Sequence, residues 1–212
     1  MKKLRLGEFE RNSLVVFAIT MIANVLSYLY QIVMGNVLTP ADYGTVNTLL
    51  SLSVVVGVPS GIISALTATY TAKYHAHGET FAIAAFMHGM LRVAAVLAAI
   101  VFVVGALLSR PIAHVLQIDD PHYVTVVMVL VASNCLGPVF SSTLQGVKRF
   151  IPYSMNSVLS FAFRLLLGVI FVWLGWGIPG ALAALILAAC LTMLYCLFKS
   201  RDLFFAPVKE KL

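Results

Sequence analysis

Charged residues are scarce in this sequence, and its long apolar runs contain no acidic residue at all. Only 10% of the 212 residues are charged, whereas 61% are hydrophobic. Soluble domains carry about 25% charged residues, so this chain has too little polar surface to cover a globular fold in water. We therefore expect lipid to be the solvent for much of it. The net charge of +6 does not indicate nucleic-acid binding, because no basic stripe or aromatic platform accompanies it.

Cysteine and metal-ligating residues are equally sparse. Cys135, Cys190 and Cys196 all fall inside apolar runs, and their spacing suits neither a disulfide framework nor a zinc site. His75 and His77 make an incomplete ligand set. We predict no cofactor and no metal. Membrane enzymes of glycan assembly usually need acidic residues for metal binding or proton transfer, so the sequence disfavours an enzyme.

Apolar runs of about 20 residues, the length that crosses a membrane, recur along the chain. The N-terminal stretch MKKLRLGEFER resembles the basic start of a signal peptide. However, the following run reaches Met34, too long for an h-region of about 7–15 residues, so we read it as a retained span. No alternation typical of strands is sustained, so we predict an all-α integral membrane protein. The six predicted spans are Leu14–Met34, Thr45–Ala68, Phe86–Leu108, Tyr123–Thr143, Ser154–Leu174 and Ile178–Phe198.

The basic residues of the connections and termini alternate between the two sides of this arrangement. Arg110 lies on one side, and all the other Lys and Arg residues outside the spans lie on the opposite side. Because basic residues concentrate in the cytoplasm, the alternation predicts six spans with both termini cytoplasmic. The predicted lobe comprises residues 1–212, with a tail at 199–212.

Two predicted spans contain helix breakers. The second holds Gly57, Pro59 and Gly61, and the fourth holds Gly137 and Pro138. Proline frees a backbone carbonyl and usually kinks a helix, and interrupted spans often border transport sites. Glycine and proline are also simply more frequent in membrane helices, and the sequence leaves the two interpretations open.

Polar side chains recur on one helical face of several spans. They should point inward, either into a cavity or into hydrogen bonds between helices, and the amide stripes leave this choice open. For the small-residue face of the second span we favour helix packing. The stripes are Thr20, Asn24, Tyr28 and Gln31 in the first span; Ser53, Gly57, Ser60, Gly61 and Ser64 in the second; Asn134, Ser141 and Gln145 in the fourth; and Asn156, Ser160 and Arg164 in the fifth.

Arg164 differs from the other basic residues by its depth. It lies eleven residues beyond Tyr153, roughly 16 Å along a helix, near the middle of a hydrocarbon core about 30 Å thick. Burying an arginine there costs roughly 2.5–3.5 kcal/mol, and no span offers a carboxylate to pair with it. Its planar guanidinium suits phosphate, so we favour an anion-facing role over structural hydrogen bonding. Arg92 lies closer to a span end and can snorkel, so it is the weaker candidate.

Two stretches resemble a known family. The segment MGNVLTPADYGTVNTLLSL resembles the joint after the first span of bacterial polysaccharide exporters. The segment LQGVKRFIPYSMNSVLSFAFRLLLGVIFVWLGWGIPGALAA is similar to their spans four to six. The likeness runs from about Asn12 to Phe198 and points to the O-antigen and teichoic-acid flippases of the multidrug/oligosaccharidyl-lipid/polysaccharide exporter superfamily.

This resemblance implies one six-helix lobe of a two-lobed exporter that moves a lipid-linked oligosaccharide by alternating access. It implies that Arg164, and more weakly Arg92, meets the lipid diphosphate. We expect the glycan to meet amides, which both donate and accept hydrogen bonds. These are Asn24, Gln31, Asn134, Gln145 and Asn156.

The expected partners are a polyprenyl-diphosphate-linked glycan, membrane lipid and a second lobe or second copy of the chain. Family members usually have twelve to fourteen spans, so this chain resembles the N-terminal half alone. The expected location is the bacterial inner membrane. The alternatives are a multidrug extruder of the same superfamily, which would favour membrane carboxylates, and a truncated subunit that does not transport.

Overall fold

Helices account for the secondary structure of the described chain. The computed structural model describes residues 2–118 and 120–204, with side chains from Ser13 onward, and this part contains no strand. The all-α prediction is therefore confirmed. The helices are α1 (Lys2–Val37), α2 (Pro40–Val56), α3 (Val58–Ala76), α4 (Thr80–Leu107), α5 (Ser109–Val115), α6 (Pro121–Gly146), α7 (Phe150–Trp173) and α8 (Gly177–Phe204).

Local chemistry explains where several of these helices begin. The Thr39 hydroxyl accepts a hydrogen bond from the backbone N–H of Asp42 at 3.2 Å, and Pro40 occupies the first turn of α2. The Asp120 carboxylate accepts from the backbone N–H of His122 at 2.9 Å at the start of α6. Both are N-caps, which satisfy N–H groups that have no partner inside the helix. The turn between α7 and α8 uses Gly175 at φ +83, a conformation that other residues rarely adopt.

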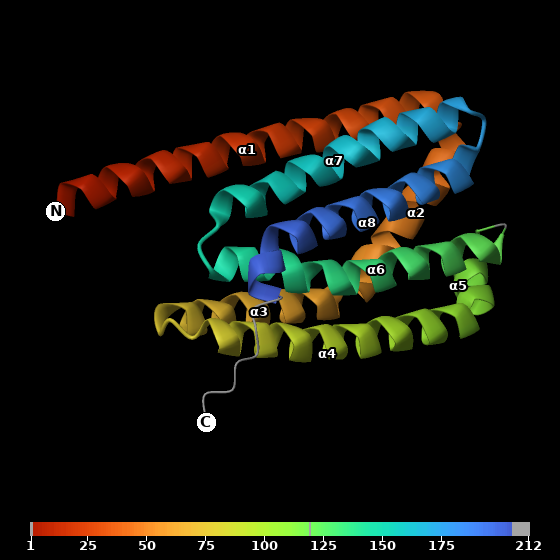
Figure 1. Cartoon of the computed structure of the whole chain (residues 1–212). Helices are drawn as coiled ribbons and strands as arrows, with labels where there is room; N and C mark the ends of the chain where they lie inside the picture. Colours follow the sequence, from red (N-terminus) through yellow and green to blue (C-terminus); the bar gives the residue numbers. More distant parts are fainter. Residues whose placement is uncertain (1, 119, 205–212) are drawn as a thin grey trace.

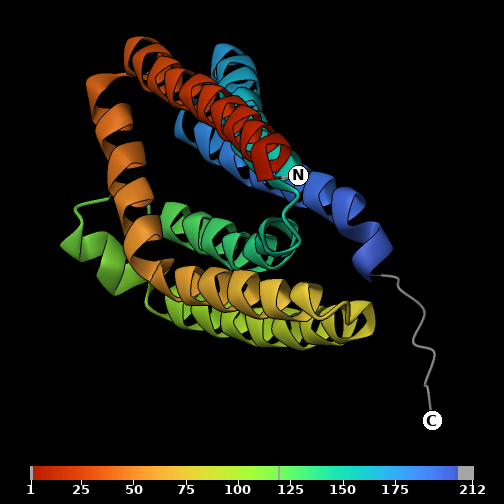
Figure 2. The ribbon, with the colours of Figure 1, turned by 90° about the vertical axis from the view of Figure 1, so that its left-hand side faces the viewer.

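The long helices form two groups that α2 connects. Figure 1 shows α1, α7 and α8 running side by side, with α3 and α4 packed under α6 in a second group. In Figure 2 the orange helix α2 descends along one side of the molecule from the first group to the second. Helices α6 and α8 contact each other and hold the groups together. Buried Leu49, Met128 and Leu185 belong to the largest core cluster, which α2, α6 and α8 share.

The second predicted span, Thr45–Ala68, is broken rather than continuous. Helix α2 ends at Val56, α3 begins at Val58, and the two axes differ by 48°. Pro59 cannot donate a backbone hydrogen bond, and its ring excludes the carbonyl four residues earlier, which explains the break. The kink predicted from Gly57 and Pro59 is confirmed. In contrast, α6 continues through Pro138 as one helix.

The predicted connection between the third and fourth spans contains the short helix α5 (Ser109–Val115). The remaining predicted spans fall on α1, α4, α6, α7 and α8, with Leu108 and Leu174 one residue beyond the ends of α4 and α7. Among the described residues, five helices are long and apolar enough to cross a membrane, or six if the bent pair counts as one span.

Apolar side chains also face outward: Leu107, Val115 and Trp173 are more than three-quarters exposed. An exterior of this kind suits lipid. The side to which the termini point stays a prediction.

Candidate functional site: a cationic cavity between the helix groups

A cavity of about 550 Å³ lies between the two groups of helices. This volume falls in the range of sites that bind small molecules. Its wall is built from α2, α3, α6, α7 and α8, and it includes Gly57 at the α2–α3 bend. The lining residues are Leu50, Ser53, Val54, Gly57, Ser60, Leu130, Ser133, Asn134, Gly137, Pro138, Ser141, Asn156, Ser160, Arg164, Ala189, Thr192, Met193 and Cys196.

Arg164 is the charged residue of this lining. Its guanidinium carbon lies 5.6 Å from the ring centroid of Phe161, three residues earlier on α7. Among the described residues, Arg164 has no hydrogen-bond partner, and its Nε atom is buried without one. The described residues that line the cavity include no carboxylate to neutralise it. An unpaired guanidinium in a low-dielectric site strongly attracts an anion, so the cavity is electrostatically suited to a negatively charged ligand.

Neutral hydrogen-bonding groups surround this charge. Asn134 on α6 and Asn156 on α7 both line the cavity. Asn156 Oδ1 accepts a hydrogen bond from Cys196 Sγ at 3.2 Å, which fixes the amide orientation and leaves the NH₂ group available as a donor. Thr192 Oγ1 on α8 donates to the Ala188 carbonyl at 2.8 Å. A cationic centre with amides and hydroxyls around it can bind an anion attached to a polyhydroxylated group.

Four of the seven predicted substrate contacts lie outside this cavity. Asn24 and Gln31 are exposed on α1, and Arg92 is exposed on α4. Gln145 is half-buried near the end of α6. The helical period identifies a face but not its neighbour, and α1 packs against α7 through a different face that includes Ala23, Tyr30 and Met34. The structure thus brings Arg164, Asn134 and Asn156 together and leaves the other four apart.

The small-residue face of the second span divides between two roles. Ser64 and Ser142 share a hydrogen bond of 2.7 Å between α3 and α6, as the packing interpretation predicts. Ser53 and Ser60 instead line the cavity, whereas the sequence favours helix packing for both. Their hydroxyls donate to the carbonyls of Leu50 and Gly57, next to the bend. The sequence signal that places Ser53 and Ser60 at a cavity is the Gly57–Val58–Pro59 break, because an interrupted helix exposes backbone polar groups to a cavity.

Cys196 and Thr192 line the cavity, although the sequence does not indicate either of them as a substrate contact. A cysteine or threonine inside an apolar run is indistinguishable from an ordinary core residue. All three cysteines are free thiols; Cys135 and Cys196 are buried and Cys190 is half-buried. Among the described residues, no group of three or more His, Cys, Asp or Glu side chains could hold a metal ion.

Fold and site together define a multi-span membrane protein with a cationic polar cavity between two groups of helices. The chain belongs to the polysaccharide biosynthesis protein family, whose model matches residues 9–211. The family assignment made from the two resembling stretches is thereby confirmed. A comparison with curated protein sequences finds no match.

Among solved structures, the chain is similar to a MOP superfamily transporter from Pyrococcus furiosus, with a TM-score of 0.68 and 16% sequence identity. The match covers 88% of this chain and 44% of the archaeal transporter. At this identity the likeness establishes the fold. The chain therefore shares the helical arrangement of less than half of that protein.

Proposed function

We propose that this chain moves a lipid-linked oligosaccharide or polysaccharide precursor across the bacterial plasma membrane by alternating access, as one wall of a larger transporter. The observation that carries the proposal is the unpaired Arg164 in a cavity without carboxylates. The substrate is a glycan attached to a polyprenyl diphosphate, and the diphosphate is the anionic group of this substrate. Arginine donates a planar pair of hydrogen bonds to phosphate oxygens and stays charged, so Arg164 serves as the phosphate contact.

The glycan would lie beside this contact, against Asn134, Asn156 and the hydroxyls near the α2–α3 bend. Amides and hydroxyls both donate and accept, so they bind sugars of different stereochemistry. Asn24, Gln31, Gln145 and Arg92 lie outside the cavity. They would contact substrate only where it extends beyond this wall. The apolar tail of the lipid would remain in the bilayer.

The opposite wall is a second lobe or a second copy of this chain, and residues 1–212 form one lobe. The length of the archaeal neighbour supports this arrangement, since the match covers 44% of it. Rocking of the two walls would open the cavity to each leaflet in turn, with both termini of this chain in the cytoplasm. The proposed role is transport rather than catalysis. A multidrug extruder for cations is disfavoured, because the cavity is itself cationic.

The test compares Arg164→Ala with Arg164→Lys in cells that depend on the chain for glycan export. We expect Arg164→Ala to abolish export and Arg164→Lys to retain part of it, because lysine keeps the charge and loses the planar fork. The measurement is the amount of lipid-linked sugar that accumulates in the inner leaflet. Arg110→Ala is the control, since Arg110 is exposed on α5 outside the cavity. Normal export by Arg164→Ala at wild-type expression refutes the proposal.

A further inference from the structure

Among the described residues, four buried side-chain polar atoms lack hydrogen-bond partners, and two of the four come from the neighbouring helices α1 and α7. These two are Oη of Tyr30 on α1 and Nε of Arg164 on α7. The helices α1 and α7 pack side by side along their length (Figure 1), and Tyr30 is only 7% exposed. The ring of Tyr30 lies beside Gly168, one helical turn after Arg164 on α7. Unpaired buried donors and acceptors are costly, so a matched donor and acceptor in this position require an explanation.

Gly168 explains how Tyr30 reaches this position. Gly168 lies four residues after Arg164, on the same face of α7. A Cβ atom there would lie 3.3 Å from Cε2 of Tyr30 and would collide with Cε of Met34. The missing side chain therefore lets α1 approach α7 closely, and the phenol ring of Tyr30 lies against α7 one helical turn from Arg164. Met34 and Tyr30 both belong to the largest core cluster, so this placement is firmly supported by packing.

The chemistry of the pair differs from that of an ion pair. A carboxylate beside Arg164 would neutralise the charge that attracts an anion. A neutral phenol offers a lone pair to Nε–H and leaves the full positive charge in place. Arg164 lines the cavity, and a hydrogen bond from its Nε–H to Tyr30 would leave both Nη groups available to a ligand there.

We propose that Tyr30 is a positioning residue: its hydroxyl accepts a hydrogen bond from Nε–H of Arg164 when an anion binds, and thereby holds the two Nη groups toward the cavity. This inference rests on the proposed phosphate-binding role of Arg164. It adds α1, which contributes no lining residue to the cavity, to the machinery that binds the ligand. Because α1 supports the phosphate contact from behind, its movement relative to α7 would change the affinity for the anion.

The experiment measures binding of farnesyl diphosphate to the full chain in lipid nanodiscs, with farnesol as the probe that lacks phosphate. The variant Tyr30→Phe keeps the ring against Gly168 and removes only the hydroxyl. We expect it to weaken farnesyl diphosphate binding about tenfold, the effect of losing one hydrogen bond to a charged group. Farnesol binding should not change, and the unfolding temperature of the unliganded protein should not fall, because the hydroxyl has no partner there. Tyr123→Phe is the control, because Tyr123 is packed against the same core cluster but does not line the cavity.

A double-mutant cycle then separates positioning from packing. In an Arg164→Ala background, Tyr30→Phe should cause no further loss, since the hydroxyl acts only through the guanidinium. An equal loss in both backgrounds overturns the inference, and so does wild-type affinity in Tyr30→Phe. If Arg164→Ala weakens binding while Tyr30→Phe does not, only the inference fails. If Arg164→Ala binds like wild type, the proposed role of Arg164 and the inference fail together.

Discussion

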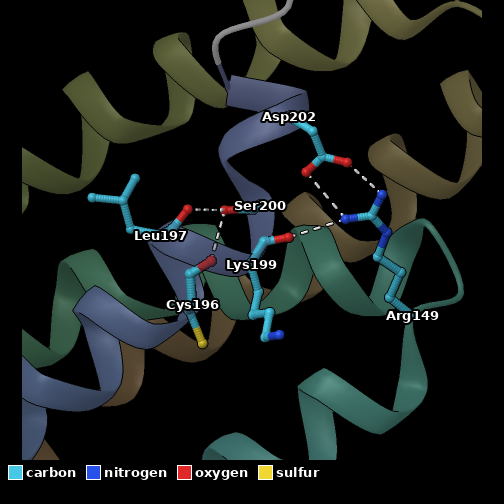
Figure 3. Close-up of polar contacts among 6 residues, drawn as sticks. All are labelled: Arg149, Cys196, Leu197, Lys199, Ser200 and Asp202. Carbon is cyan, nitrogen blue, oxygen red and sulfur yellow. Dashed lines mark hydrogen bonds and ion pairs between the residues drawn. The ribbon is translucent and has the colours of Figure 1, made fainter.

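Arg149 and Asp202 form a two-point ion pair that joins the turn between α6 and α7 to the C-terminal end of α8 (Figure 3). Nη1 of Arg149 donates to Oδ1 of Asp202 at 3.1 Å, and Nη2 donates to Oδ2. Nη1 also donates to the Lys199 carbonyl at 3.0 Å. The hydrogen bond to Asp202 raises the pKa of Arg149 above its ordinary value, so the guanidinium stays charged. The pair connects α7, which carries Arg164, to α8 at one end of the cavity wall.

We predict that Asp202→Ala lowers the free energy of unfolding by no more than about 1 kcal/mol, because exposed ion pairs are weak in water. The two side chains are 41% and 52% exposed, so solvent screens their attraction. The measurement is the thermal midpoint in detergent at low salt and at high salt, where the difference from wild type should shrink. The charge-exchanged variant Arg149→Asp/Asp202→Arg is the control and should recover part of the loss. A loss of several kcal/mol that salt does not reduce contradicts this prediction.

A second prediction concerns the bend between α2 and α3. A Cβ atom at Gly57 would lie 2.8 Å from the backbone carbonyl oxygen of Ser53, closer than real side chains approach. Gly57→Ala should therefore shift the bend and destabilise the fold by about 1–3 kcal/mol, the usual cost of overpacking. Gly61→Ala, four residues further along the same bent pair, is the matched control, since its Cβ atom would meet nothing within 4 Å.

Thermal midpoints of the two variants, measured in the same detergent, test this difference. Gly61→Ala should match wild type or exceed it slightly, because alanine favours helix more than glycine does. Gly57 also lines the cavity, so Gly57→Ala should in addition lower glycan export. Equal midpoints for Gly57→Ala and wild type would show that the bend does not depend on this close approach.

The sequence predicts how deep a residue lies in the membrane better than it predicts which helix packs against a given face. Arg164 was conspicuous because a charge in an apolar run is rare and expensive, and the structure places it in the cavity lining. Asn24 and Gln31 were equally polar and equally periodic, yet they are exposed on α1. A stripe specifies which side chains share a face. Which helix that face meets depends on long-range packing, here on Gly168 admitting Tyr30 and Met34.

The α2–α3 bend and the position of Tyr30 illustrate the same limit. Gly57 and Pro59 predicted a kink, because the loss of one backbone donor and a ring clash act locally. The size of the bend, 48°, depends on how α2 and α3 pack on α6 and could not be read from local residues. Tyr30 was invisible as a functional candidate, since a tyrosine in an apolar span is usually an ordinary core residue. Its unpaired hydroxyl emerges only once α1 is placed against α7.

The last prediction tests whether the cavity is the route of the substrate. Ser160 lies one helical turn before Arg164 and lines the cavity, so a bulky side chain there should occupy the space beside the phosphate contact. We expect Ser160→Phe to abolish most glycan export while the charge of Arg164 is retained. The measurement is accumulation of lipid-linked sugar in the inner leaflet at matched expression.

The control for this experiment lies on the same helix. Ser157 is exposed and lies outside the cavity lining, so Ser157→Phe adds the same bulk to α7 without filling the cavity. It should export like wild type, because an apolar ring on an exposed face of a spanning helix suits lipid. Because Ser160→Phe leaves Arg164 intact, a loss of export would come from occupied space rather than from lost charge. Normal export by Ser160→Phe would mean that the substrate does not pass this wall, and equal losses in both variants would indicate damage to α7 itself.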